Sequence, residues 1–260
     1  MDRPSSAQLS VVQAEDRRVI NRLLVFFALV YVVEGVGQVE GLIAQPLSFY
    51  LKEVHGWTAL EVSAYLTIFN FPWIIKPLYG AFSDFVPLFG YRRKPYLLAA
   101  NIVAAGAFLW VTQLTAPGEL LWALELTAYA MAMSSTVCGA VLVESGQRLG
   151  ESGRFVNQQW LWFNAATMFA SIAGGALAQR LPPTSALHVA AAIVAIAPLA
   201  VLFGTVFLIP DQKTPIDLPA LRTTFGSLVT AFCKRELWVV GLSFFSIISI
   251  PASTRRSTTT

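Results

Sequence analysis

Long blocks of apolar residues, separated by short polar segments, make up most of this chain. A block of about 20 apolar residues is long enough to cross a lipid bilayer as one helix. The pattern predicts six such spans, over residues 23–51, 60–82, 95–115, 120–143, 159–178 and 186–209. It therefore predicts an all-α polytopic membrane protein.

These spans divide the chain into five parts. We expect a cytoplasmic N-terminal segment over 1–22, a six-helix transmembrane bundle over 23–209, a cytoplasmic linker over 210–234, a partial seventh transmembrane helix over 235–250 and an aberrant polar tail over 251–260. The linker is polar and rich in proline, which is typical of a connection between two domains.

Positive charge is distributed unevenly over the predicted loops. The N-terminal segment and every second loop after it hold thirteen Lys and Arg residues, whereas the remaining loops hold two, Lys52 and Arg180. Lysine and arginine accumulate in cytoplasmic loops. The asymmetry predicts a cytoplasmic N-terminus and an integral protein of the plasma or inner membrane.

Composition argues against several other classes of protein. Hydrophobic residues make up 55% of the chain and charged residues 13%, which is about half the charged share of soluble domains. The net charge of +3 is spread over loops, so we expect no nucleic-acid partner. Cys138 and Cys233 lack the spacing of a metal site, and no enzyme motif is present. We therefore expect no enzyme activity, catalytic residue, metal or cofactor.

Several polar side chains fall inside the predicted spans. Glu34 and Glu40 lie in the first span, and Asn70 and Lys76 lie in the second. Ionisable residues at membrane depth mark substrate or proton paths by default, although a buried ion pair can also be structural. We expect these four residues to line a path for substrate or a coupling proton, with Glu34 paired to Lys76 if their helices are adjacent. Glu125 is interpreted as an interfacial residue that extends outward to water.

A motif of glycines and charged residues joins the second and third spans. Gly80 and Asp84 stand near the end of the second span, and Gly90, Arg92 and Arg93 follow in the loop. Glycine permits close helix packing, and an aspartate can pair with an arginine. Contacts of this kind would close the cytoplasmic side and break when that side opens. The alternative is that the cations only orient the protein in the membrane.

This motif resembles the loop between helices two and three of the major facilitator superfamily. Within that superfamily, residues 75–80, 83–84 and 90–93 are similar to the folate–biopterin transporter branch. The resemblance covers the first six spans and the start of a seventh, and it implies the N-terminal half of a twelve-helix transporter. One departure stands in the fourth span, where Ser135 and Gly139 occupy positions that are often acidic in the branch. This departure weighs against cation coupling through those positions.

The end of the chain departs from the pattern of the preceding spans. An apolar run gives way to Ser-Thr-Arg-Arg-Ser-Thr over residues 253–258. Suitable codons from Ser246 onward, read two bases later, would encode a Tyr-Tyr-Phe-Asn-Pro-Gly-Phe run that resembles helix seven of the same branch. We therefore expect a frameshift near Phe245 that removes the C-terminal half. A natural short protein is the alternative.

Taken together, these features predict secondary active transport of a small organic solute by alternating access. The resemblance implies a pterin- or folate-like solute, with proton or cation coupling. The partners are the lipid bilayer and the solute, together with self-association or a missing second half. Two alternatives stay open: a membrane assembly or scaffold protein related to pigment handling, and a non-functional fragment.

Overall fold

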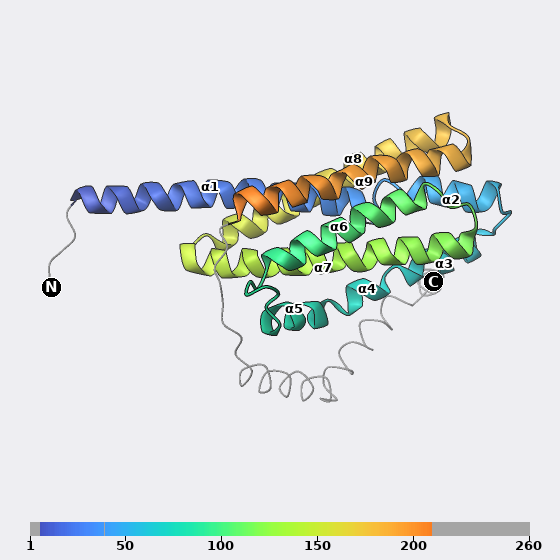
Figure 1. Ribbon diagram of the computed structural model, residues 1–260. Helices are drawn as coiled ribbons and strands as arrows, with labels where there is room; N and C mark the ends of the chain where they lie inside the picture. Colours follow the sequence, from blue (N-terminus) through green and yellow to red (C-terminus); the bar gives the residue numbers. More distant parts are fainter. Residues whose placement is uncertain (1–5, 39, 210–260) are drawn as a thin grey trace, which may run out of the picture. The chain divides into compact units, whose positions relative to one another are not determined.

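The computed structural model describes residues 6–38 and 40–209, and within them the chain forms helices joined by short connections (Figure 1). In chain order these are α1 Ser6–Gly37, α2 Ala44–Glu53, α3 Ala59–Ile68, α4 Phe71–Ile74, α5 Lys76–Phe85, α6 Lys94–Val111, α7 Pro117–Leu149, α8 Ser152–Arg180 and α9 Pro183–Leu208. The only strand pairing in the described part is one isolated β-bridge between Leu88 and Tyr91.

Five of these helices are long and apolar enough to cross a membrane. They are Glu15–Gly37 of α1 and the whole of α6, α7, α8 and α9. Since a bilayer has no water to satisfy backbone polar groups, helices of this length are a favourable way to span it. The protein is an all-α polytopic membrane protein, as the sequence predicts.

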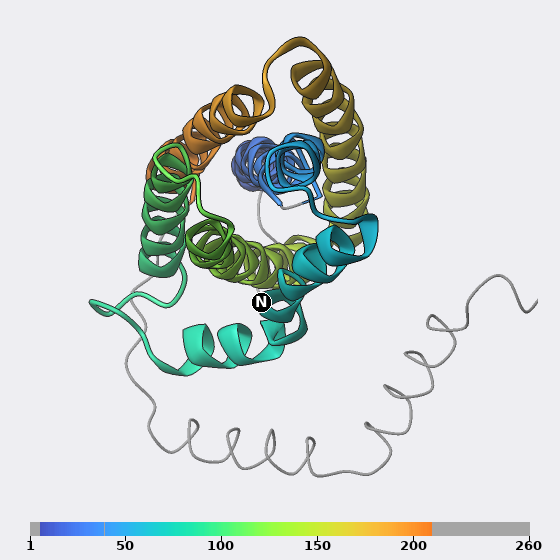
Figure 2. The same ribbon diagram turned by 90° about the vertical axis from the view of Figure 1, so that its right-hand side faces the viewer.

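The first helix forms the centre of the bundle. Figure 2 shows α1 and α2 surrounded by α6, α7, α8 and α9, and α1 packs directly against α7, α8 and α9. Phe26, Phe27 and Tyr31 of α1 are almost fully buried as a result. Helix α6 lies between α7 and α9 and completes the ring.

The first predicted span is not a single helix. Helix α1 begins at Ser6, inside the predicted N-terminal segment, and ends at Gly37, and α2 begins only at Ala44. The chain turns so tightly between them that a Cβ on Gly41 would lie 2.3 Å from the carbonyl oxygen of Val36. Only glycine fits such a close approach of backbone to backbone. The expectation of a continuous helix over 23–51 is therefore wrong.

The second predicted span is also interrupted, and prolines explain the breaks. Helix α3 ends at Ile68, four residues before Pro72, and α5 begins at Lys76, next to Pro77. A proline has no N–H to donate to the carbonyl four residues earlier, and its ring clashes with that carbonyl. The short helices α3, α4 and α5 therefore replace the single helix expected over 60–82.

Connections with many cations gather at one end of the bundle. Lys94, at the start of α6, donates a hydrogen bond to the carbonyl of Val206 near the end of α9 (3.1 Å). At the opposite end, Tyr65 of α3 donates to the carbonyl of Pro117, the first residue of α7 (2.8 Å). The predicted linker, seventh helix and polar tail all lie outside the described residues.

Candidate functional site

An ion pair between a buried carboxylate and a half-buried ammonium, with a bridging hydroxyl, joins α1, α5 and α7. The ammonium of Lys76 lies 4.0 Å from the Glu34 carboxylate. Ser135 of α7 stands between them: its hydroxyl accepts a hydrogen bond from Lys76 (3.1 Å) and donates one to Glu34 (2.8 Å). Glu34 is only 7% exposed, and its second oxygen, Oε2, has no hydrogen-bond partner among the described residues. The cluster is therefore satisfied on one side of the carboxylate and open to a further partner on the other.

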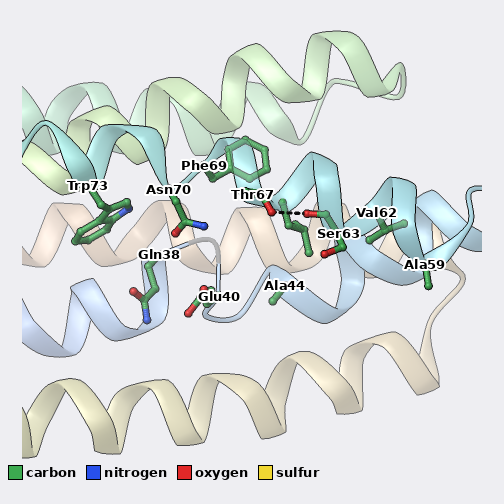
Figure 3. A pocket seen from close by; sticks show the side chains of 11 residues that line it. Gln38, Glu40, Ala44, Ala59, Val62, Ser63, Thr67, Phe69, Asn70 and Trp73 are labelled. Carbon is green, nitrogen blue, oxygen red and sulfur yellow. Dashed lines mark hydrogen bonds between the residues drawn. The ribbon is translucent and has the colours of Figure 1, made fainter. Parts of the chain in front are cut away.

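A pocket of about 400 Å³ lies where the two interrupted spans meet. Residues from the α1–α2 junction, α2, α3, the α3–α4 junction and α4 line it. In Figure 3 the Asn70 side chain, from the α3–α4 junction, points toward Gln38 and Glu40, from the α1–α2 junction. Interrupted helices are a common way to build a binding site at membrane depth, because their ends expose polar groups to a cavity.

Trp73 connects the pocket with the ion pair. Its ring lines the pocket, and the Lys76 ammonium lies 4.2 Å from the ring centre in a cation–π arrangement. A cation over the face of an indole is attracted by the negative potential of the ring. A ligand that stacks on Trp73 would therefore also change the surroundings of Lys76.

A second group of charged residues ties the α5–α6 connection to α7. Arg93 lies 2.6 Å from the Asp84 carboxylate of α5 and 2.6 Å from the Glu144 carboxylate of α7. It also donates to the hydroxyl of Ser83 (3.1 Å). Arg92 lies farther from the same two carboxylates, at 3.4 and 3.7 Å. One guanidinium thus bridges two helices closely, and its neighbour supports the bridge.

The two glycines of this motif play different parts. Gly90 has a φ of +82°, in the left-handed region that favours glycine, and it turns the chain before the arginines. A Cβ on Gly80 would meet only Thr136, at an ordinary contact distance of 3.6 Å. An alanine therefore fits in place of Gly80, whereas Gly90 is required by the backbone conformation.

The predicted path residues fall into two adjacent groups. Glu34 and Lys76 belong to the ion pair, and Glu40 and Asn70 belong to the pocket. Sequence reasoning did not assign Ser135 as the bridging residue or Gln38 as a lining residue. Nothing in the sequence marks Ser135 as a bridge, because its role depends on which way α7 is turned.

Two acidic residues were interpreted wrongly from the sequence. Glu144 was expected in a loop, but α7 continues to Leu149 and carries it to Arg93. Glu125 was expected to extend outward to water, but it is buried inside the bundle and only 8% exposed. The signal for Glu144 was its place at the end of the fourth predicted span, on the same side of the membrane as the loop that carries Arg92 and Arg93. Among the described residues, no group of His, Cys, Asp and Glu is arranged to hold a metal ion.

Comparison with known proteins gives a consistent picture. The sequence model of the BT1 family matches residues 35–253. The chain is 31% identical over 188 residues to the folate-biopterin transporter of Synechocystis sp., an alignment that covers 71% of this chain and 36% of that relative. It is 27% identical over 252 residues to the probable folate-biopterin transporter 6 of Arabidopsis thaliana, covering 90% of this chain and 48% of that relative. The chain thus spans less than half the length of both relatives. No solved structure matches it.

Proposed function

The chain belongs to the BT1 family, and on this premise we propose that it serves the transport of a small organic solute, pterin- or folate-like, across a membrane. The names of its relatives and the apolar helices support this proposal. The observation that carries it is the pocket between the two interrupted spans, because that pocket brings together the polar side chains of Gln38, Glu40 and Asn70.

The chemistry of the pocket suits a pterin ring. A pterin carries adjacent N–H and NH₂ donors on one edge, and a carboxylate such as that of Glu40 accepts two parallel hydrogen bonds of this kind. The amides of Gln38 and Asn70 offer both donors and acceptors to the remaining ring atoms. Trp73 supplies a flat surface for an offset stack. A pocket of about 400 Å³ also lies within the range that holds small ligands.

We further propose that the described bundle acts as one half of a major-facilitator transporter that works by alternating access. The bridge from Arg93 to Asp84 and Glu144 would hold the cytoplasmic side closed. Opening that side would separate α7 from the α5–α6 connection and break this bridge. The ion pair of Glu34 and Lys76 would line the path between the gate and the pocket.

The orientation belongs to the same proposal. The cationic connections at one end of the bundle, around Arg92, Arg93 and Arg154, support a cytoplasmic position for that end, because lysine and arginine resist translocation. The N-terminus would then be cytoplasmic, in the plasma or inner membrane. A fusion of alkaline phosphatase after Lys52 should be active outside the cytoplasm, and one after Arg93 should not be.

Binding and transport can be tested with the 260-residue chain in liposomes. We expect vesicles that contain the chain to bind radiolabelled biopterin or folate in equilibrium dialysis, and to exchange it across the membrane where a second copy of the chain supplies the other half of the transporter. Glu40→Gln should weaken binding about tenfold or more, because a carboxylate that accepts two hydrogen bonds contributes about 1.5–3 kcal/mol. The matched control is Glu119→Gln, since Glu119 is an exposed acid outside the pocket.

The two measurements separate the parts of the proposal. Binding that depends on Glu40 but without exchange would support the pocket and refute transport by this chain alone. Equal binding by the wild type, Glu40→Gln and protein-free vesicles would refute the solute class and the pocket together.

A further inference from the structure

A second carboxylate inside the bundle has a very different environment from that of Glu34. Glu125 lies on α7, about two turns from its first residue, and is 8% exposed. Its Oε1 atom is buried and has no hydrogen-bond partner among the described residues. No ion pair joins Glu125 to a lysine or arginine of the described part either, whereas Glu34 has both Lys76 and Ser135.

A tyrosine on the neighbouring helix shares this environment. The hydroxyl of Tyr79, on α5, is buried and has no hydrogen-bond partner among the residues that the structure describes. Tyr79 interacts electrostatically with Glu125 and with Tyr129, which lies one turn after Glu125 on α7. Helices α5 and α7 pack together, and Thr136 of α7, about three turns after Glu125, lies beside Gly80 of α5. Two buried polar atoms that lack hydrogen-bond partners among the described residues, Oε1 of Glu125 and the hydroxyl of Tyr79, therefore belong to helices that pack together.

The other titratable groups on helices packed against α7 are occupied elsewhere. Helix α4 contains none. Lys76 of α5 donates to Ser135 in the Glu34 cluster, and Asp84 of α5 pairs with Arg93. On α6, Lys94 donates to the carbonyl of Val206 and Tyr96 to that of Val86. On α1, Glu34 is engaged by Lys76 and Ser135, and Tyr31 lies beside Cys138. The other charged groups of α1 all precede Glu34 by three turns or more: Glu15, Asp16, Arg17, Arg18 and Arg22. The arginines of α8 are at its two ends, Arg154 and Arg180.

We propose that Glu125, with Tyr79 beside it, forms a proton-binding site inside the membrane that is separate from the solute pocket and supplies the coupling ion. An ionised carboxylate that is buried without a cation is strongly disfavoured, so Glu125 takes one proton from water and becomes a neutral acid. Its release of that proton would follow when motion of α5 against α7 admits water. Ser135 and Gly139 of α7 have no carboxyl group to carry a proton. Glu125, on the same helix, would therefore carry it.

Proton binding is read directly by infrared spectroscopy of the chain in phosphatidylcholine–phosphatidylglycerol vesicles. A protonated carboxylic acid has a C=O stretch that is distinct from the bands of a carboxylate. At neutral pH we expect this band in the wild type, its loss in Glu125→Gln, and its persistence in Glu34→Gln, the matched buried acid that has a cation. The band should disappear reversibly as the pH is raised.

A second variant keeps the test valid if Glu125→Gln does not fold. Tyr79→Phe removes only the hydroxyl beside Glu125, so the band should persist at a shifted frequency. A band that is absent from the wild type, or that Glu125→Gln leaves in place in a folded protein, overturns the proposal. An unshifted band in Tyr79→Phe overturns the part assigned to tyrosine.

The coupling role rests on the proposed transport function, but the proton site does not. If the band behaves as expected and the same vesicles move no solute, the proton site stands and its coupling role is refuted. If the vesicles exchange solute and a pH gradient drives no accumulation, coupling through Glu125 is refuted while transport stands.

Discussion

Replacement of Arg93 by glutamine tests whether one arginine of the pair holds α7 to the α5–α6 connection. The Arg93 guanidinium lies 2.6 Å from both Asp84 and Glu144, and its side chain is 11% exposed. The Arg92 guanidinium is farther from both carboxylates, and its side chain is 35% exposed. The two arginines are adjacent in the sequence, so Arg92→Gln is a matched control with the same chemistry.

The expected loss follows from these distances and exposures. A hydrogen bond to a charged group contributes about 1.5–3 kcal/mol; Arg93 donates one to Glu144 and also forms a close ion pair with Asp84. Water reaches both partners, because the side chains of Asp84 and Glu144 are 35% and 52% exposed, and this reduces the loss. We expect Arg93→Gln to lower the free energy of unfolding by about 2–3 kcal/mol. Arg92→Gln should lower it by about 0–1 kcal/mol, as for an exposed ion pair.

The assay is equilibrium unfolding in mixed micelles with increasing dodecyl sulfate, followed by far-ultraviolet circular dichroism. A double-mutant cycle with Glu144→Gln then isolates the pairwise interaction. We expect a coupling energy of about 1–2 kcal/mol for Arg93 with Glu144 and a smaller one for Arg92. Equal losses for the two arginines, or a negligible coupling of Arg93 with Glu144, would refute the assignment of the bridge to Arg93.

Three further predictions concern packing and backbone geometry in the same bundle. Ser135→Ala should destabilise the protein by about 1–3 kcal/mol in the same unfolding assay, because Glu34 and Lys76 lose their bridging hydroxyl; an unchanged midpoint would contradict this. Gly174→Ala should lower the free energy of unfolding by about 1–3 kcal/mol, since its Cβ would lie 2.5 Å from a backbone oxygen of the α1–α2 connection. Gly106→Ala, where no atom lies within 4 Å, is its control, and equal losses would argue against the close approach. Gly90→Ala should lower the free energy of unfolding by about 1–2 kcal/mol, because alanine is strained at the left-handed φ of +82°. An unchanged free energy would mean that this turn adopts another backbone conformation without cost.

Much of the architecture follows from the sequence alone. Apolar blocks of membrane length predict helices because the backbone has no water to bond with inside a bilayer. The breaks in the second span also follow from the sequence, because Pro72 and Pro77 each remove a helical hydrogen bond whatever the tertiary contacts around them. The pairing of Asp84 with the two arginines could also be predicted, because these residues are close in sequence and a single turn at Gly90 brings them together.

The tertiary structure decided which polar residues meet across helices. Glu34 and Ser135 are far apart in the sequence, and their hydrogen bond exists only because α1 and α7 pack with those faces together. The same applies to Glu144, which reaches Arg93 because α7 continues past the expected end of its span. Glu125 shows the limit most clearly. Its position near a span end indicated contact with water, but the way α7 packs in the bundle leaves it only 8% exposed. Hydropathy fixes which segments are helical, whereas the rotation of each helix about its axis depends on packing against its neighbours.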